Sequence, residues 1–443
     1  MMRKLGKILA ISVMILMAPN GFMGEKEKID ECEELTFVDW GGYLEPFFDR
    51  SKIITVGSNG RDTLFAGGNG TLVRYDGDQW YDLTDEVSEG DGCIMWYDVE
   101  WNGEYWLLLG GRVDSTNLKF SPKIWRIDAD LKEFTPLHLD LPSKYFPKVA
   151  LTAAWNSVDE YWLIGGQDFS TIDATGWKMG GALVKYDGKA FLDVRDQLVS
   201  TNPLDFFTGR RWFAGGVFAI GYNPTYNSFL IGGGSPNFDI TRLSYAKSEW
   251  VGDFNKKFLY ISQNTNRHGK PWETFLWKGA AIGHQAITWN PVDEYWLIGG
   301  WYGMLNMATE EQVSTHSSFT DLSDLLTNFS RKGRKSDVSG ILWDPENNGF
   351  LISGGDFDFK YNMKKRSYGS LNFAYSHTIL SNSPFTDLSD KLIKWDLARE
   401  GIHYMAFNND INSPAFYIVG GENMRGPKVN YGMVNKWPDQ IDP

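Results

Sequence analysis

The sequence contains few of the residues that most often carry catalytic or metal chemistry. It has two cysteines and six histidines in 443 residues, and the histidines follow no spacing typical of metal ligands. The motifs GxSxG, HExxH and CxxC are absent, and so is a calcium-binding EF-hand loop. The sequence therefore gives no sign of an α/β-hydrolase, a zinc protease or a metal–thiolate centre, and we expect no cofactor.

Positive charge is also scarce. Lys and Arg number 43 against 56 Asp and Glu, which gives a formal net charge of −13. A negative surface repels the phosphate backbone, so nucleic acid is not expected as a partner.

Long apolar runs are missing except near the start of the chain. A basic segment, 1–7, precedes the apolar run 8–18, which is the form of a secretory signal. The run is shorter than the ~20 residues that span a bilayer. The residues around Ala18 and Gly24 make a poor cleavage site, so a retained membrane tether is an alternative, and a buried N-terminal element is another. We predict a signal peptide or tether with a polar spacer at 1–28 and a single domain at 29–443. The domain is expected outside the cytoplasm, secreted or anchored at the cell surface, with membrane contact only through an uncleaved N-terminal segment.

Two kinds of covalent modification fit an exported chain. Cys32 and Cys93 can form one disulfide in an oxidising compartment, and the sequence leaves open whether they pair. The sequons that begin at Asn69 and Asn328 permit N-glycosylation in a suitable host.

The most informative feature that is present is an internal repeat. Residues 155–166 read WNSVDEYWLIGG and residues 289–300 read WNPVDEYWLIGG. Shorter relatives of this segment end in Gly-Gly pairs, and seven such pairs begin at positions 67, 110, 165, 232, 299, 354 and 420. The spacing of 43 to 67 residues fits a unit of four strands with loop insertions.

Each unit contains four short runs, here called a to d. Run a ends in an aromatic residue, as in TAAW (152–155), with a small residue three places earlier that suits a strand crowded around a central axis: Thr152, Ala219, Ala286 and Gly340. Run b is the YWLIGG strand, apolar at successive positions as in a strand buried on both faces. Run c ends in Asp-Gly, a strong hairpin signal, and run d resembles FTDLS.

The two ends of the chain complement each other. The last unit lacks a run d, whereas ELTFVDW (34–40) near the start resembles one. We expect this N-terminal strand to complete the last unit, which joins the ends of a ring and removes two open sheet edges.

These motifs resemble those of known propeller families. The double glycine after run b, with a tyrosine in run c and an aromatic residue in run d, resembles the kelch repeat, and the ring closure is similar to that of WD-repeat propellers. The units are also similar to those of exported propellers of archaea and bacteria. The resemblance covers roughly 34–437 and implies an all-β fold: a seven-bladed β-propeller of four-stranded antiparallel blades, closed by an N-terminal strand. It implies no particular function, since propellers carry unrelated activities.

The b–c and d–a connections are the expected working surface. In a propeller they lie on one face, and here they are long and dissimilar, for example 167–180, 199–215, 251–280, 356–368 and 422–430. They combine aromatic rings with charged groups, a mixture that suits sugar rings or a protein hot spot. The candidate ligand-binding residues are Asp168, Arg211, Trp212, Trp272, Trp301, Tyr302, Asp356 and Asp358. A metal site at Asp356 and Asp358 is less expected, because alternate carboxylates on a loop are usually solvated.

Three functions remain open from the sequence. The leading one is a non-catalytic binding or scaffold propeller that engages protein or glycan. The second is a carbohydrate-active hydrolase or lyase that uses carboxylates of the same face, with Asp168, Asp356 and Glu422 as candidates, although nothing in the sequence pairs them. The third is a structural subunit of a cell-surface layer or appendage.

Overall fold

The structure is a computed structural model, and it describes 38–39, 41–44, 46–48, 53–88, 94–114, 119–140, 148–173, 176–198, 216–235, 240–261, 284–300, 303–315, 317–327, 329–331, 334–335, 337–355, 369–392, 402–408, 415–420 and 433–437. The chain divides into a unit of Met1–Leu35 and a unit of Thr36–Pro443. All described residues belong to the second unit, so Cys32, Cys93 and Asn328 lie outside the described part of the chain.

The described strands form seven antiparallel sheets of four strands and one small two-stranded sheet. In ring order the sheets are β2(Ile53–Ser58), β3(Thr63–Gly67), β4(Leu72–Tyr75), β5(Trp80–Asp82); β6(Ile94–Trp101), β7(Tyr105–Asp114), β8(Lys119–Asp128), β9(Phe134–Pro136); β10(Val149–Asn156), β11(Tyr161–Asp173), β12(Gly176–Tyr186), β13(Phe191–Asp193); β14(Gly216–Asn223), β15(Ser228–Ser235), β16(Ile240–Lys247), β17(Leu259–Tyr260); β18(His284–Asn290), β19(Tyr295–Gly300), β20(Met304–Thr309), β21(Thr320–Asp321); β24(Asp337–Asp344), β25(Gly349–Gly355), β26(Gly369–Tyr375), β27(Thr386–Asp387); and β28(Ile402–Asn408), β29(Ala415–Gly420), β30(Met433–Trp437), β1(Val38–Asp39). The small sheet pairs β22(Ser330–Arg331) with β23(Arg334–Lys335).

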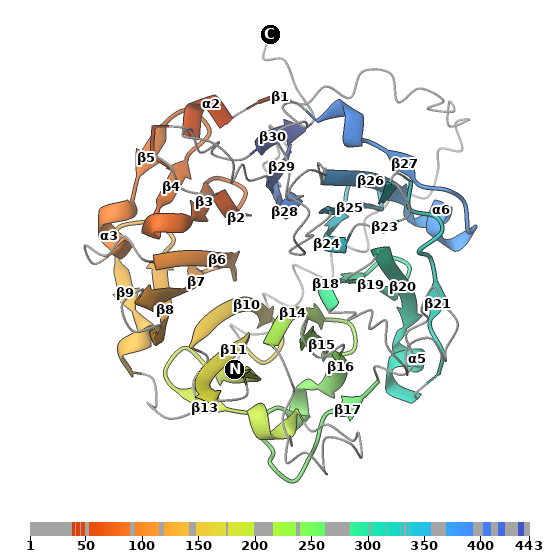
Figure 1. Ribbon diagram of the computed structural model, residues 1–443, viewed down its shortest axis with the longest axis horizontal. Helices are drawn as coiled ribbons and strands as arrows, with labels where there is room; N and C mark the ends of the chain where they lie inside the picture. The colour runs from red at the N-terminus through yellow and green to blue at the C-terminus, as the bar shows by residue number, and fades with distance from the viewer. Residues whose placement is uncertain are drawn as a thin grey trace, which may run out of the picture. The chain divides into compact units, whose positions relative to one another are not determined.

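The sheets stand around a common axis with their first strands innermost (Figure 1). Each innermost strand contacts that of the next sheet, in the closed cycle β2, β6, β10, β14, β18, β24, β28 and back to β2. Runs a to d of the sequence are therefore the four strands of one sheet, counted outward. This is a β-propeller.

The chain closes the ring as its two ends predicted. β1 pairs with β30, with Val38 opposite Lys436 and Asp39 opposite Asn435. β1 thus takes the outermost place that Thr320–Asp321 and Thr386–Asp387 take in their own sheets. The last sheet is built from both ends of the chain.

The b strands carry the core between the sheets. Trp162 and Trp296 are at most 1% exposed. The first glycine of the following pair allows the next sheet to approach closely, because a Cβ on Gly165 would clash with Val217 and a Cβ on Gly299 would clash with Val338. Along the same b strand, the repeat therefore places a large aromatic ring, which fills the space between sheets, and a glycine, which lets the next sheet approach closely.

Polar residues of the repeat fix the turns. Asn156 Oδ1 accepts the backbone N–H groups of Val158 and Asp159 at 2.9 and 2.8 Å, which forms the a–b turn. Asp187 Oδ1 accepts two backbone N–H groups in the same way, and Gly188 follows with a φ of 85° in the c–d turn. The Asp-Gly dipeptide is therefore the hairpin turn that the sequence predicted.

Two segments expected as loops of the working face have a different structure. Much of 167–180 is strand, because β11 and β12 continue as a hairpin with Asp173 opposite Gly176. In 251–280, the first part is the c–d connection and the outer strand β17, since Leu259 pairs with Tyr245.

The sequence TRLSYAK, which lacks Asp-Gly, is nevertheless the third strand, β16. The run-c motif was thus too strict a criterion for this sheet.

The helical segments are short. They include α2(Gly41–Leu44), α3(Thr84–Ser88), α5(Glu310–Thr315) and α6(Ser376–Leu380), with 3-10 turns such as η1(Gly68–Gly70) and η4(Ser248–Trp250). In the portion of the chain that the structure describes, none has the length and apolar character needed to cross a membrane.

Candidate functional site

A cavity of about 380 Å³ lies on the axis of the ring. It is lined by residues of the innermost strand of every sheet, which in β10, β14, β18 and β24 come from the middle of the strand. Most of the lining is apolar or small, as expected from the small residues of run a. Glu100 and Tyr404 are the only ionisable residues among the described residues that line it.

The cavity wall holds a cluster of two carboxyl groups around one phenol, the acidic cluster. Tyr404 Oη lies 2.5 Å from Asp98 Oδ1 and 3.0 Å from Glu100 Oε1. The other oxygen of Asp98, Oδ2, accepts the backbone N–H of Ala153 at 2.9 Å. Asp98 is 1% exposed, whereas Glu100 and Tyr404 are partly exposed. Asp98 and Glu100 are two residues apart on β6, so they project from the same side of that strand.

The surroundings of the acidic cluster favour protonated carboxyls. Burial raises the pKa of Asp98 to about 7, against the hydrogen bonds from Tyr404 and the Ala153 backbone. Burial and the neighbouring charge of Asp98 raise the pKa of Glu100 well above its usual range. Burial and the same two carboxylates also raise the pKa of the Tyr404 phenol.

The sequence contains a signal for this cluster, at a position where two of the repeats differ from the others. Counted back from the aromatic residue that ends run a, Asp98 and Tyr404 stand at the place that is small in Thr152, Ala219, Ala286 and Gly340. The two departures from the template are the residues that meet in space. By contrast, the carboxylate set expected from the sequence is not brought together by described contacts: Asp356 and Glu422 lie outside the described residues.

On the face that carries the a–b and c–d turns, polar side chains join neighbouring sheets. Asn156 Nδ2 donates to Ser248 Oγ at 2.6 Å, and Ser248 Oγ donates to Asp159 Oδ2 at 2.6 Å. Asn290 Nδ2 bonds Ser376 Oγ at 3.1 Å, and Ser376 bonds Asp293 at 2.5 Å, one repeat pair further on. In these two copies of WNxVDEYW, the asparagine, aspartate and tyrosine therefore make contacts between sheets.

Between these two junctions a glutamate takes the place of the serine. Glu310 is 9% exposed and accepts hydrogen bonds from Asn223, Ser228, Tyr245 and Trp296, at 2.8 to 3.1 Å. Four donors satisfy the carboxylate, so it stabilises the junction without a basic partner.

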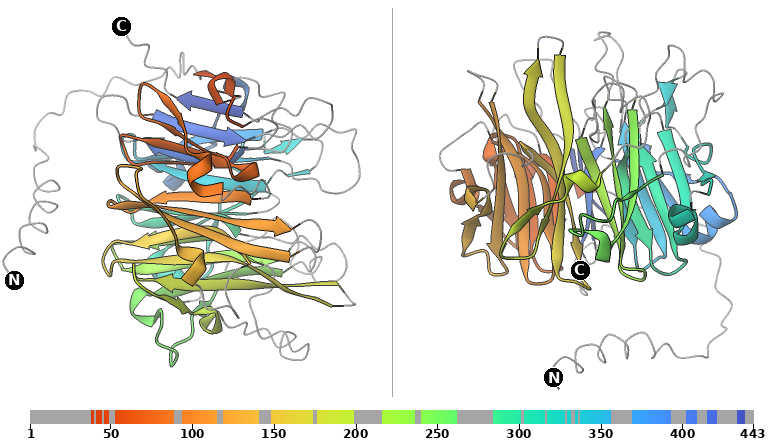
Figure 2. Two further views of the ribbon diagram at one scale, coloured as in Figure 1. Left: turned by 90° about the vertical axis from the view of Figure 1, so that its left-hand side faces the viewer. Right: turned by 90° about the horizontal axis from the view of Figure 1, so that it is seen from below.

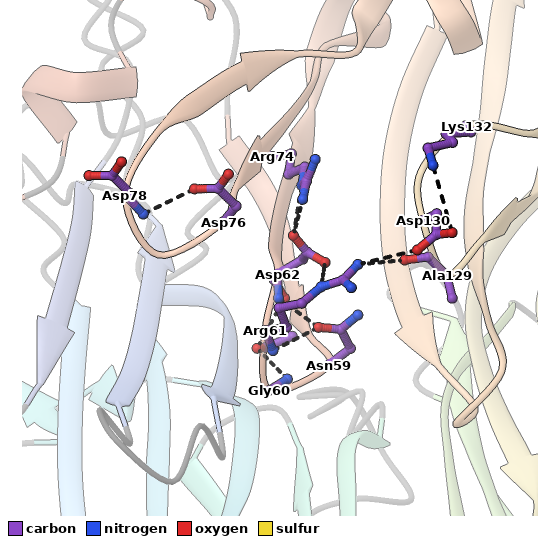
Figure 3. A network of polar contacts seen from close by, with 11 residues as sticks. Asn59, Gly60, Arg61, Asp62, Arg74, Asp76, Asp78, Ala129, Asp130 and Lys132 are labelled. Carbon is purple, nitrogen blue, oxygen red and sulfur yellow. Dashed lines mark hydrogen bonds and ion pairs between the residues drawn. The ribbon is translucent and has the colours of Figure 1, made fainter.

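The junction between the first two sheets uses ion pairs instead (Figure 3). Asp62 is fully buried, and its carboxylate accepts hydrogen bonds from Arg61 Nε at 2.8 Å and from Arg74 Nε at 2.7 Å. Arg61 also donates to the backbone oxygen of Ala129 in the next sheet, at 3.0 Å. Different residues therefore perform the same linking role on this face.

The opposite face carries the b–c connections, and several of them are extensions of strands. β7 pairs with β8 as far as Asp114 and Lys119, and β15 pairs with β16 as far as Ser235 and Ile240. The β11–β12 hairpin is the longest, and in the right view of Figure 2 it extends beyond the neighbouring strands. Paired strands hold such projections in a defined direction.

Most ligand-binding candidates from the sequence lie outside the described residues: Arg211, Trp212, Trp272, Trp301, Tyr302, Asp356 and Asp358. Asp168 lies in β11, where it pairs with Gly180, so it is on the hairpin that projects from this face. Asn69 is exposed in the first b–c connection with a φ of 57°, and Thr71 of its sequon is 4% exposed. Across the described ranges, no three His, Cys, Asp or Glu side chains gather in a way that would hold a metal ion.

Comparison with known proteins gives similarity in fold. No family model and no curated protein matches the sequence. Among solved structures, YCF48 bound to a D1 peptide is similar with a TM-score of 0.50 and 11% identity, over 91% of this chain and 94% of that one. The extracellular domain of a protein designated a hybrid two component system, from B. thetaiotaomicron, is similar with a TM-score of 0.53 and 12% identity, over 91% of this chain and 40% of that one. At this identity the similarity shows the propeller fold and no more.

Proposed function

We propose that the chain is a non-catalytic binding or scaffold propeller that acts outside the cytoplasm. It engages a partner protein through the face of its b–c and d–a connections. In this proposal the seven four-stranded sheets are the blades of one ring, residues 29–443 form that domain, and residues 1–28 are a signal peptide or tether. Glycan is the alternative partner.

The difference between the two faces carries the proposal. On the turn face, polar side chains such as Asn156, Asp159 and Ser248 are bonded between neighbouring sheets. On the other face, the β11–β12 hairpin projects past the sheet as paired backbone as far as Asp173 and Gly176. Connections that project from a rigid scaffold are where propellers and other β-folds most often bind. The proposed contact residues are those of this face, from Asp168 to Asp358, as named from the sequence.

The described carboxyl pair does not favour glycoside hydrolysis. A hydrolase needs two carboxyls on opposite sides of a scissile bond. Asp98 and Glu100 instead share one phenol between them, with Tyr404 Oη within 3.0 Å of both. A sugar has no room between carboxyls that are bridged in this way.

Two of the similar structures have properties of the kind proposed for this chain. One is solved with a bound peptide, and another is an extracellular domain. These are properties of those proteins, and they support a binding role and an extracytoplasmic location for this chain as proposals.

The test compares the two faces directly. In a hairpin-shortened variant, an Asn-Gly turn replaces 168–180 and joins Gln167 to Gly181, which are opposite each other in the register. The matched control changes the exposed Val158 and Val292 of the turn face to serine. Wild-type protein is used to select binders from a displayed peptide library and is applied to a glycan array, with a hydrolysis assay in parallel.

We expect selected peptides to bind wild type and the turn-face control equally, and to bind the hairpin-shortened variant at least ~10-fold more weakly. Glycan binding that is lost in the same variant would favour the glycan alternative. Turnover of any glycan, or binding that is lost only in the turn-face control, would contradict the proposal.

A further inference from the structure

The acidic cluster lies apart from the proposed binding face and has a stereochemical requirement of its own. A phenol carries one hydrogen, yet Tyr404 Oη lies within hydrogen-bonding distance of an oxygen of Asp98 and an oxygen of Glu100. With both carboxyls ionised, one of these contacts would have no hydrogen. The geometry therefore requires a proton on one carboxyl.

The contacts indicate which carboxyl holds that proton. Asp98 accepts the backbone N–H of Ala153 on one oxygen and makes the shorter contact to Tyr404, at 2.5 Å, on the other. Both contacts suit an ionised Asp98. Glu100 then carries the proton and donates it to Tyr404 Oη at 3.0 Å. The raised pKa of Glu100 agrees with this arrangement.

The cluster joins strands that belong to different parts of the ring. Tyr404 lies on β28, which is in the sheet completed by β1, and the two carboxyls lie on β6. In the cycle of innermost strands, β2 stands between β28 and β6, and Ala153 lies on β10. The cluster thus connects the two sheets that flank the first sheet, and one of them is the sheet that β1 completes.

We propose that the acidic cluster is a proton-operated latch between the two sheets that flank the first sheet. With one proton bound, hydrogen bonds connect Glu100 to Tyr404 and Tyr404 to Asp98. Loss of the proton leaves two carboxylates on one phenol, breaks one hydrogen bond and sets like charges against each other. The sheets that begin with β28 and β6, on either side of the first sheet, are then held together less firmly.

Among the described residues, no cationic side chain acts on the pKa of Asp98, Glu100 or Tyr404. β2 and β10 contain no titratable residue. β6 itself also carries Tyr97, whose pKa is raised by burial. β7 packs against β6 and contains Tyr105, whose hydroxyl accepts a hydrogen bond from Trp162 Nε1, the exposed Arg112, and Asp114, whose side chain lies outside the described part. Beside Tyr404, β28 contains His403, whose side chain lies outside the described part, β29 contains Tyr417, and β24 contains Asp337 and Asp344.

The sign of the pH effect follows from the raised pKa values. The folded state binds protons on these carboxyls more tightly than the unfolded chain does. Their stabilising contribution is therefore complete below the unfolded pKa of about 4 and is lost as pH rises through the folded pKa values of the pair. The pKa is raised to about 7 for Asp98 and well above the usual range for Glu100, the carboxyl that holds the latch proton. Unfolding should become easier between these limits, which is opposite to the effect of the ordinary surface carboxylates.

The experiment measures unfolding by urea from pH 4.5 to 8.5 in wild type, Glu100→Gln and the exposed control Glu133→Gln. The amide of Glu100→Gln donates to Tyr404 at every pH. We expect the unfolding constant of wild type, relative to Glu100→Gln, to rise about tenfold or more across this range, and Glu133→Gln to follow wild type. If wild type and Glu100→Gln show the same pH dependence, the proposal is wrong.

A second measurement locates the effect. Amide hydrogen exchange, corrected for the intrinsic pH dependence, should show that protection in β28 and β6 falls as pH rises, whereas protection in β19 does not. Asp98→Asn replaces Glu100→Gln in both experiments if the latter fails to fold. Protection that changes equally in β28 and β19 would contradict a local latch.

Discussion

Asn156 donates a hydrogen bond of 2.6 Å to Ser248, across the boundary between the third and fourth sheets. Ser248 is 3% exposed and also contacts Asp159 and the hydroxyl of Tyr161, at 2.6 and 2.8 Å. Hydrogen bonds from Ser248 and Asn227 lower the pKa of Asp159. One hydroxyl therefore satisfies several polar groups at a junction of sheets.

Replacing that hydroxyl should destabilise the fold. We expect Ser248→Ala to cost about 1–3 kcal/mol, because Asn156 and Tyr161 lose a partner in a buried place. Ser376→Ala should behave in the same way at the equivalent junction. Urea unfolding measures both, and the exposed Ser314→Ala is the control. A loss no larger than that of the control would show that the junction does not depend on the serine.

Two glutamates occupy a backbone conformation that does not suit them. Glu160 and Glu294 end their a–b turns with φ values of 56° and 55°, while Asn227 and Asn348 hold the corresponding place in other sheets. Because asparagine tolerates the left-handed region better, Glu160→Asn and Glu294→Asn should each stabilise the protein by about 0.5–1 kcal/mol. Thermal melting checks this, with Glu133→Asn as the control for the change in charge. Equal effects at all three sites would contradict the backbone explanation.

The glycine at the end of a b strand should not accept a methyl group. Gly165→Ala places a Cβ against Val217 of the next sheet, and we expect a loss of about 1–3 kcal/mol. The double variant Gly165→Ala/Val217→Ala should recover part of this loss relative to the sum of the single changes, because the second change makes room. Strict additivity in urea unfolding would rule out this contact as the cause.

Removal of the N-terminal strand should weaken the fold much more than removal of the leader. A protein lacking 1–28 keeps β1, whereas one lacking 1–40 loses the strand that pairs with β30. We expect a clearly lower melting temperature for the shorter protein, because the last sheet then has an open edge. Equal melting temperatures would show that closure by β1 contributes little.

Substitution of a buried tryptophan in a b strand should cause a large loss of folding free energy, with which the other variants can be compared. Trp162 is 1% exposed, and its Nε1 donates to the Tyr105 hydroxyl at 3.0 Å. We expect Trp162→Ala to cost about 3–5 kcal/mol. The loop residue Trp301, which lies outside the described residues, is predicted to cost less on the same substitution while weakening partner binding. The reverse order in urea unfolding would remove Trp301 from the proposed binding surface.

The repeat made the strands predictable because the strands of every unit pack between neighbouring sheets in the same way. The WLIGG segment signals a strand buried on both faces, and in the structure Leu163 and Ile164 are fully buried. The connections were less predictable, since pairing beyond the sheet depends on partners rather than on a local motif. The extension of β11 past Asp168 is one case, and β17, which has only two residues, is another.

The site was harder to predict because its residues are meaningful only in three dimensions. Asp98 and Tyr404 are 306 residues apart, and each is unremarkable in its own unit. Comparison of equivalent places in the repeats would have singled out both, since each replaces a small residue beside the axis. The aromatic residues proposed for the loop face rest on composition and position, and they stay a prediction.

The pairing of β1 with β30 also determines the order in which the protein can be completed. Val38 and Asp39 are synthesised long before their partners Asn435 and Lys436. Until β30 has been made, the growing chain is an arc with an unpaired strand at its beginning, and the last sheet lacks two of its four strands. The ring can close only after residues up to Lys436 are available, so the open edges of the arc need protection from aggregation until then.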